Sequence, residues 1–198
     1  VGQQALVHKI LNFVAYLLSN EMPGSPAQIL RDKGWVSQLS ASPSPTQYGN
    51  YGTLNVNIEL TDEGMKNRET IVATIMQYID LIKKEGVDSK YFNEIKTSLS
   101  NQFKFLEKGD EFNYVSSLTG SMQVYPLNHT INAPYYYAKF DADAVNNVLD
   151  QLNAKTLRVW YISQQEETDS QLHFYDGKYR INDISDDEIA SWKKPSEF

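Results

Sequence analysis

The chain has 198 residues, 41% hydrophobic and 22% charged, a composition typical of a globular protein that buries a sizeable core. The net charge of -7 at pH 7 argues against a nucleic-acid partner, because phosphate binding needs clustered Lys and Arg. The absence of Cys excludes disulfides, thiolate metal sites and a Cys nucleophile, and no apolar run is long enough to predict a membrane span.

The chain begins with a pattern that predicts a helix, because apolar residues recur three and four positions apart between Leu6 and Leu18. The Pro23-Gly24 pair then breaks the chain, and Ser25 followed by proline is a typical start for a second, short helix. Gly34 has the position of a glycine that ends a helix. This part of the sequence therefore predicts two helices joined by a defined turn.

Two strands are expected next, separated by a loop rich in turn-forming residues. Residues 35–41 predict a strand, and residues 42–50 predict a mobile surface loop. Thr53 to Leu60 alternates apolar and polar side chains, which is the pattern of a strand with one buried face. Such a strand belongs to an antiparallel sheet with one wet or loosely covered side.

A helical block follows. Thr61 is expected to cap a helix that continues to Glu85, and Asp88 to cap a second one, and we expect these two long helices to pack as a hairpin. Two further helices are predicted over residues 112–125 and 141–152.

The C-terminal part again contains strand signals. Residues 156–163 alternate like a strand, residues 164–171 predict a loop, and residues 179–184 are expected to be extended. Ser185 then opens a last short helix that ends near Trp192. Strands before and after a helical block favour an α+β fold, in which long helices cover an antiparallel sheet, over a doubly wound parallel sheet.

Motifs of known chemistry are absent from the sequence. Its three histidines do not form H-E-x-x-H or H-x-x-E-H, and nucleotide-binding glycine loops and a G-x-S-x-G elbow are also missing. A Ser–His–Asp triad is defined by geometry, so sequence order leaves it open. The carboxylates at Asp141, Asp143 and residues 183–188 are interpreted as helix caps, and Tyr135 to Tyr137 as core or interface residues.

Several short segments, in this order, resemble the second domain of the pitrilysin and insulin-degrading (insulysin) zinc metallopeptidases. They cover nearly the whole chain, and the ordered set is more specific than any one piece. The segments are E-x-P-G-S at Glu21 to Ser25, K-G-W at Lys33 to Trp35, Leu60 to Gly64, Gln77 to Ile79 with Gly86, Tyr125 to Leu127, and Arg158 to Ser163.

The resemblance implies a large zinc endopeptidase with four similar α+β domains around a chamber. In that family the first domain carries H-x-x-E-H and the zinc, and the second is a non-catalytic duplicate, which this chain matches. Residues 1–198 are therefore predicted to be one domain without its first strand, with residues 185–198 starting the linker to the next domain. We expect no catalytic residue, no metal ligand and no peptidase activity in this chain alone, and a zinc ion only in the parent enzyme's first domain.

The same resemblance implies an exosite that anchors the N-terminal end of a peptide substrate, with matching positions at Ser19, Glu21, Leu39, Ser40 and Ala41. The family's glycines stand here as Ser19 and Ala41. A strand edge can accept another chain by backbone pairing, and a nearby carboxylate can hold an α-ammonium group. The alternative is that Glu21 is a solvated acid in a turn and that the strand is an interior one.

Two functional hypotheses follow, and a third is weaker. The chain is the scaffold and substrate-anchoring domain of a zinc oligopeptidase, or it belongs to a non-catalytic homologue and serves only assembly. The third hypothesis is an independent hydrolase that uses carboxylates. The expected partners are peptide substrates and the other domains of the same polypeptide, without nucleic acid or membrane. A bacterial pitrilysin would be periplasmic, with its targeting signal upstream of Val1.

Overall fold

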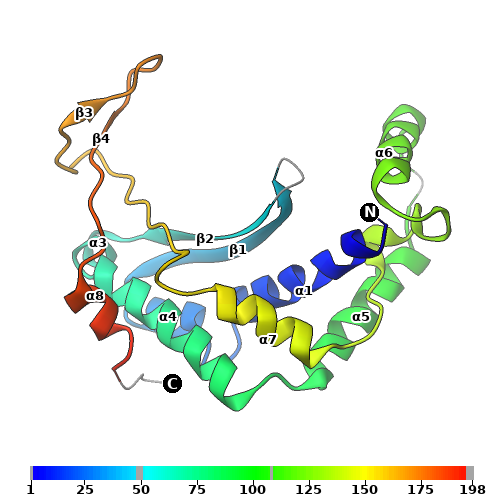
Figure 1. Ribbon diagram of the computed structural model, residues 1–198, viewed down its shortest axis with the longest axis horizontal. Coiled ribbons are helices and arrows are strands. Elements are labelled where there is room, and N and C mark those ends of the chain that lie inside the picture. Colours follow the sequence, from blue (N-terminus) through cyan, green and yellow to red (C-terminus); the bar gives the residue numbers. More distant parts are fainter. Residues whose placement is uncertain (1, 48–50, 108, 195–198) are drawn as a thin grey trace.

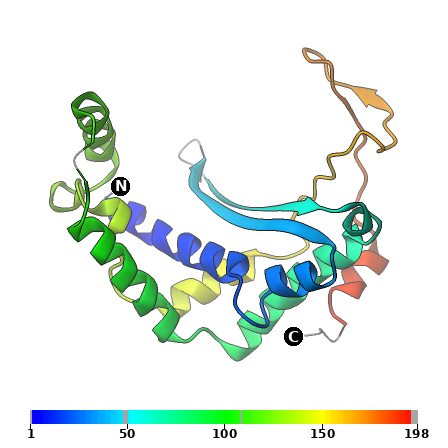
Figure 2. The same ribbon diagram turned by 180° about the vertical axis from the view of Figure 1, so that it is seen from behind.

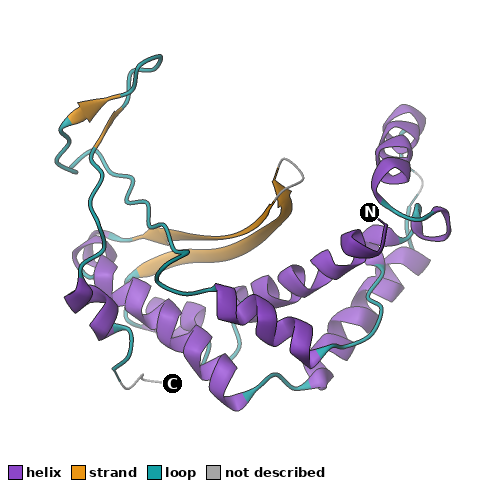
Figure 3. Ribbon diagram, viewed as in Figure 1, coloured by secondary structure: helices purple, strands orange, loops and turns teal. Residues whose placement is uncertain are grey.

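A long β-hairpin lies over a layer of helices, which together form an open crescent (Figure 1). The structure is a computed structural model that describes residues 2–47, 51–107 and 109–194. Figure 2 shows the same layers from behind, and in Figure 3 most of the helices lie on one side of the hairpin. The expected α+β class, with helices covering an antiparallel sheet, is confirmed.

The first two helices form as their caps predict. Helix α1 (Gly2–Ser19) is followed by a turn and by α2 (Pro26–Asp32), whose first free N–H groups are capped by Ser25. The Ser25 hydroxyl accepts a hydrogen bond from the Gln28 N–H at 3.3 Å. Gly34 has a φ of 70°, in the left-handed region that glycine adopts without a steric penalty, and the chain turns there into the first strand.

The hairpin is longer than the sequence indicates. Strand β1 (Val36–Gln47) pairs in antiparallel fashion with β2 (Tyr51–Leu60), so residues 42–47 are strand, and the loop predicted there is wrong. Prolines are tolerated in an edge strand at positions where no N–H has to reach a partner, which is why turn-forming residues misled the prediction. The rest of the predicted loop, residues 48–50, lies outside the described residues.

Hydrogen bonds join the two ends of the hairpin at its base. The Trp35 carbonyl accepts a hydrogen bond from the Thr61 N–H at 3.0 Å, and the Thr61 hydroxyl donates to the Gly34 carbonyl at 2.7 Å. The same hydroxyl accepts from the Gly64 N–H at 3.0 Å and so caps α3 (Asp62–Lys66). The Gly64 backbone lies so close to Trp35 that a Cβ at Gly64 would stand 2.8 Å from the Trp35 carbonyl carbon.

The next helical stretch differs from the prediction in two ways. The helix expected from Thr61 to Glu85 is interrupted at Asn67, where φ is -106°, and it continues as α4 (Arg68–Glu85). Helix α5 (Ser89–Lys104) starts at the predicted cap, Asp88. The two helices do not pack as a hairpin, because Gly86, with φ at 78°, sends the chain away from α4 (Figure 1). Helix α4 instead contacts α1, α2 and α7.

One helix stands apart from the body. Helix α6 (Glu111–Val124) has no buried side chain, and it rises at one end of the crescent (Figure 1). Two 3₁₀ turns, η1 (Leu127–His129) and η2 (Ala133–Tyr135), lead back to the body. Helix α7 (Ala142–Gln151) then packs against α1 and α4, so the helices predicted over 112–125 and 141–152 are confirmed.

The strand predicted over residues 156–163 is wrong, because no described strand pairs with this segment. The alternation of exposed and covered side chains is nevertheless present from Leu157 to Ile162. A small hairpin follows, formed by β3 (Ser170–Gln171) and β4 (Lys178–Tyr179), within a region expected to be loop and extended chain. Helix α8 (Asp186–Ser191) begins at its predicted cap, Ser185.

An aromatic cluster joins the early and late parts of the chain. The Phe13 ring meets the Phe92 ring edge-on, with centroids 5.5 Å apart, and Phe92 also contacts Phe140 at 5.6 Å and Tyr137 at 5.1 Å. Phe13 is fully buried, and burial raises the pKa of Tyr137 to about 12. Side chains from α1, α5 and the segment before α7 therefore share one core.

The close approach at the base of the hairpin gives a first test. Gly64→Ala should destabilise the fold by about 1–3 kcal/mol, because its Cβ would overlap the Trp35 carbonyl group. Gly120→Ala is the matched control, since nothing lies within 4 Å of a Cβ there and alanine favours the interior of α6. Chemical unfolding of both variants measures the difference, and equal stabilities would contradict this account of the junction.

The aromatic cluster gives a second test. Phe13→Ala should cost about 3–5 kcal/mol of unfolding free energy, because it removes a fully buried ring and leaves a cavity among Phe92 and Phe140. Phe112→Ala removes the same ring from a position that is 78% exposed, and it should have little effect. If both variants unfold at the same denaturant concentration, Phe13 does not hold the core together.

Candidate functional site

The five residues of the predicted site lie on or between three elements that contact one another. Ser19 is the last residue of α1, Glu21 lies in the turn before α2, and Leu39, Ser40 and Ala41 lie in the first half of β1. Helix α1, helix α2 and strand β1 each contact the other two. The turn and the strand are therefore parts of one packed unit.

Local hydrogen bonds fix the turn. The Ser19 hydroxyl donates to the Ala15 carbonyl at 2.9 Å, so it is already engaged within α1. The Asn20 amide donates to the Leu17 carbonyl at 2.8 Å, and its oxygen accepts from the Met22 N–H at 3.2 Å. The turn can thus present its backbone and Glu21 in a set position.

The Glu21 side chain is paired, which the sequence did not indicate. Its two carboxylate oxygens accept hydrogen bonds from the Arg31 guanidinium at 2.6 and 3.0 Å. These hydrogen bonds hold the pKa of the Glu21 carboxyl below its usual range, so it is charged at neutral pH. Both side chains are about half exposed, at 58% and 44%, so the pair stays accessible to solvent and to competing charges.

At this site strand β1 presents backbone groups to a ligand, and most of its side chains there pack on the core. Leu39 is 5% exposed and belongs to the core, and Ala41 packs against the same core, whereas Ser40 between them belongs to the opposite face. The register pairs Leu39 with Ile58 and Ala41 with Val56 on β2. Within the described residues, no strand pairs with the other edge of β1. That edge carries N–H and C=O groups able to receive an extended chain.

A small cavity of about 230 Å³ lies behind the turn, where the turn meets the end of α4 and the start of α5. Burial raises the pKa of the Tyr78 phenol in its wall, and Asn20 is hydrogen-bonded to that phenol. The cavity therefore connects the turn to the helical layer and does not open between the turn and β1.

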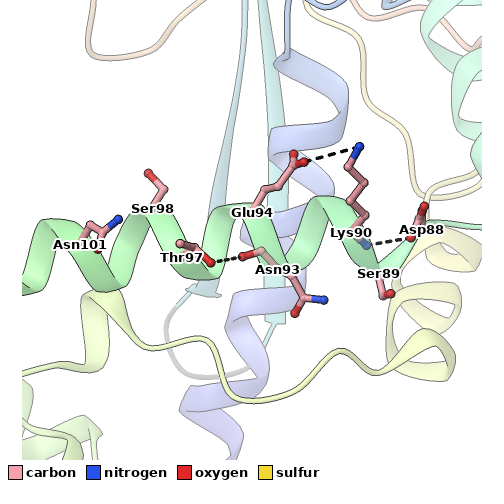
Figure 4. A pocket seen from close by; sticks show the side chains of 8 residues that line it. All are labelled: Asp88, Ser89, Lys90, Asn93, Glu94, Thr97, Ser98 and Asn101. Atoms are coloured by element: carbon pink, nitrogen blue, oxygen red, sulfur yellow. Dashed lines mark hydrogen bonds and ion pairs between the residues drawn. The ribbon is translucent and has the colours of Figure 1, made fainter.

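A second hollow lies along α5 (Figure 4). Its polar side chains all come from one helix face and its cap, and they bond mainly to one another or to their own backbone. Asp88 accepts from the Lys90 N–H at 2.8 Å, and the Lys90 ammonium lies 3.9 Å from a Glu94 oxygen. Nothing in this arrangement brings a nucleophile, a base and an oxyanion donor together.

The zinc ion that the resemblance implies for the parent enzyme does not fit the residues present. No group of three His, Asp or Glu residues able to hold a metal ion occurs among the described residues. His129 stacks on Tyr136 with centroids 4.2 Å apart, and His173 contacts Phe174. The Asp141 carboxylate caps α7 by accepting from the Ala144 N–H at 3.0 Å, as the sequence predicted.

The tyrosine run contributes to the core, which confirms its interpretation as a structural feature. Tyr137 is 4% exposed, and the Tyr135 ring lies 5.7 Å from the Phe103 ring.

None of the helices in the described part of the chain has the length and apolar character needed to cross a membrane.

Comparison with known proteins explains the ordered motifs. Residues 3–99 match the family described as "Peptidase M16 inactive domain", and residues 103–198 match "Middle or third domain of peptidase_M16". The two matches meet within α5, a single continuous helix. The prediction of one domain over residues 1–198, with a linker from residue 185, stays a prediction.

Individual relatives agree with this assignment. The chain is 33% identical over 181 residues to Protease 3 of Escherichia coli (strain K12), and 32% identical over 184 residues to the insulin-degrading enzyme of Drosophila melanogaster. These alignments cover 91% and 92% of this chain but 19% and 18% of the relatives, so the chain spans about a fifth of their length.

A solved structure shows the same arrangement of helices and strands. The crystal structure of pitrilysin superposes with a TM-score of 0.88 and 32% sequence identity, covering 94% of this chain and 20% of pitrilysin. Two adjoining matches, curated relatives and a solved structure thus point the same way, and the chain belongs to the peptidase M16 family, in which residues 3–99 match the inactive domain and residues 103–198 match the middle or third domain.

Proposed function

We propose that the chain is a non-catalytic part of a zinc-dependent metalloendopeptidase, where it forms part of the chamber wall and anchors the N-terminal end of a peptide substrate. The site consists of the turn at Ser19 and Glu21 and the strand at Leu39, Ser40 and Ala41. The observation that carries this proposal is the edge of β1 with which no described strand pairs, next to two helices that fix an exposed carboxylate.

The edge of β1 suits peptides of many sequences. Leu39 and Ala41 turn their side chains to the core, so an incoming chain would meet the strand mainly through backbone N–H and C=O groups. Strand addition of this kind gives affinity through the main chain and needs no particular substrate side chain. It agrees with a peptidase that handles varied peptides.

Glu21 would supply the charge that selects a free N-terminus. The hydrogen bonds from Arg31 lower the pKa of the Glu21 carboxyl, and a peptide α-ammonium is a compact cation with three N–H donors. The α-ammonium would have to share or displace the Arg31 guanidinium. This exposed ion pair can exchange partners, because neither side chain is buried.

The same ion pair favours a second candidate function. A Glu21 carboxylate already satisfied by Arg31, and a Ser19 hydroxyl bonded within α1, would also suit a domain that serves only assembly in a non-catalytic homologue. The two candidates differ in one respect, because only the exosite requires Glu21 to recognise peptide.

The two candidates can be separated by titrating one extended peptide, with its N-terminus free or acetylated, against the chain. The free peptide should bind several-fold more tightly, because only it offers an ammonium group, and Glu21→Gln should abolish this preference while Arg31→Gln should increase it. Calorimetry measures the affinities. Glu63→Gln, which disrupts the exposed Glu63–Lys66 pair, is the control. Equal affinities for both peptides would support the assembly role.

Strand addition on β1 has its own test. A peptide N-methylated at alternate residues lacks the N–H groups that face β1, and it should bind much more weakly than the parent peptide. Methylation of the other alternate set leaves those N–H groups intact and should change affinity little. Competition binding measures both peptides, and equal weakening by the two sets would rule out edge pairing.

A further inference from the structure

Between α7 and α8 the chain leaves the helical layer and returns to it. Residues 157–163 run along the body, and residues 164–183, the C-terminal arm, carry β3 and β4 outward (Figure 1). In both ribbon views the arm stands at the opposite end of the crescent from α6. No backbone hydrogen bond to another described backbone group holds residues 158–163. The segment that begins at Leu157 meets the body through side chains, those of Leu157 and Tyr161.

One side chain from the first half of the sequence meets it. Arg68, the first residue of α4, donates a hydrogen bond to the Glu166 carboxylate at the base of the arm. Its guanidinium carbon lies 4.5 Å from the centre of the Tyr161 ring. The Arg68 and Glu166 side chains are 29% and 23% exposed, so solvent screens this pair less than the exposed ion pairs. We name Arg68, Tyr161 and Glu166 the Arg68 clamp.

Arginine suits both contacts at once. The planar guanidinium can stack on an aromatic ring while its N–H groups reach a carboxylate, which a lysine ammonium cannot do with the same geometry. The Tyr161 hydroxyl is buried, so this side chain lies against the body. The hydroxyl has no hydrogen-bond partner among the described residues. Leu157 packs against the core at the other end of the same segment.

The far end of the arm returns to the same helix. Helix α8 lies on α4, the Gln77 amide donates to the Ser191 carbonyl at 3.2 Å, and the Trp192 side chain is buried in the core. Both bases of the arm are thus fastened to α4, the first by the Arg68 clamp and the second by α8.

We infer that Arg68 is a positioning residue: by clamping Tyr161 and Glu166, it sets the direction in which the C-terminal arm leaves the helical body. The arm exposes large apolar side chains at Phe174, Tyr175 and Ile181, and within the described residues its strands β3 and β4 pair only with each other. Release of the first base would leave only α8 to orient the arm. This inference is independent of the exosite, which lies on other residues.

Spin labels can test this, because the chain contains no Cys and labels can be placed at will. Ser98→Cys on α5 and Asp176→Cys at the exposed end of the arm give one distance between body and arm. Electron paramagnetic resonance should show a single narrow distance distribution with Arg68 present. Arg68→Gln should broaden it and remove its single maximum, because the arm base is freed. Glu166→Gln, a milder change on the arm side, should do the same.

Lys66→Gln is the matched control, since it removes a cation two residues away whose ion pair with Glu63 is exposed and confined to α3. It should leave the distribution unchanged, and the charge-swapped pair Arg68→Glu with Glu166→Arg should restore part of the narrow distribution. A narrow distribution in both single variants, or a broad one in the unsubstituted chain, would overturn the inference. Equal broadening by Lys66→Gln would overturn it as well. Circular dichroism confirms that each variant is folded.

Discussion

The contact between the Trp35 carbonyl and the turn from Thr61 to Gly64 is the constraint on which the rest of the structure depends. It closes the base of the hairpin, where one strand starts and the other ends, and the Thr61 hydroxyl uses the same place to start α3. Because β1 leaves from this point, its path over α1 and the place of Leu39 to Ala41 are set by it. Two of the short segments that carry the family resemblance are Lys33 to Trp35 and Leu60 to Gly64. They contact each other through the backbone at the base of the hairpin.

The site combines rigidity with accessible charge. The turn at Ser19 and Glu21 is held by hydrogen bonds among its own neighbours, whereas the Glu21–Arg31 pair is open to solvent. A binding surface with these properties loses little backbone entropy when a ligand binds, and it keeps one electrostatic contact that can change partners. The proposed exosite relies on this division between a fixed main chain and a charge that can change partners.

Features that depend on neighbouring residues could be predicted from the sequence, and features that depend on distant ones could not. The caps at Ser25, Thr61 and Asp88 need only a side chain that reaches an N–H two or three residues on, so their positions were correct. Three other features depend on distant partners or on one glycine dihedral. The extension of β1 past residue 41 depends on its pairing with β2, and the angle between α4 and α5 depends on Gly86. Residues 156–163 are not a strand because no described strand pairs with them. The five site residues were placed by family likeness, but Arg31 was missed because only the folded turn brings it to Glu21.

The aromatic cluster has a consequence for how the chain is divided. The boundary between the two family matches falls inside α5, but Phe92 of that helix packs on Phe13 from the first part and on Tyr137 and Phe140 from the second. Cutting the chain near residue 100 would cut α5 and separate Phe13 and Phe92 from Tyr137 and Phe140. The borders of the sequence families thus differ from those of the packed core, because ring contacts such as Phe13 with Phe140 join residues on both sides of the boundary.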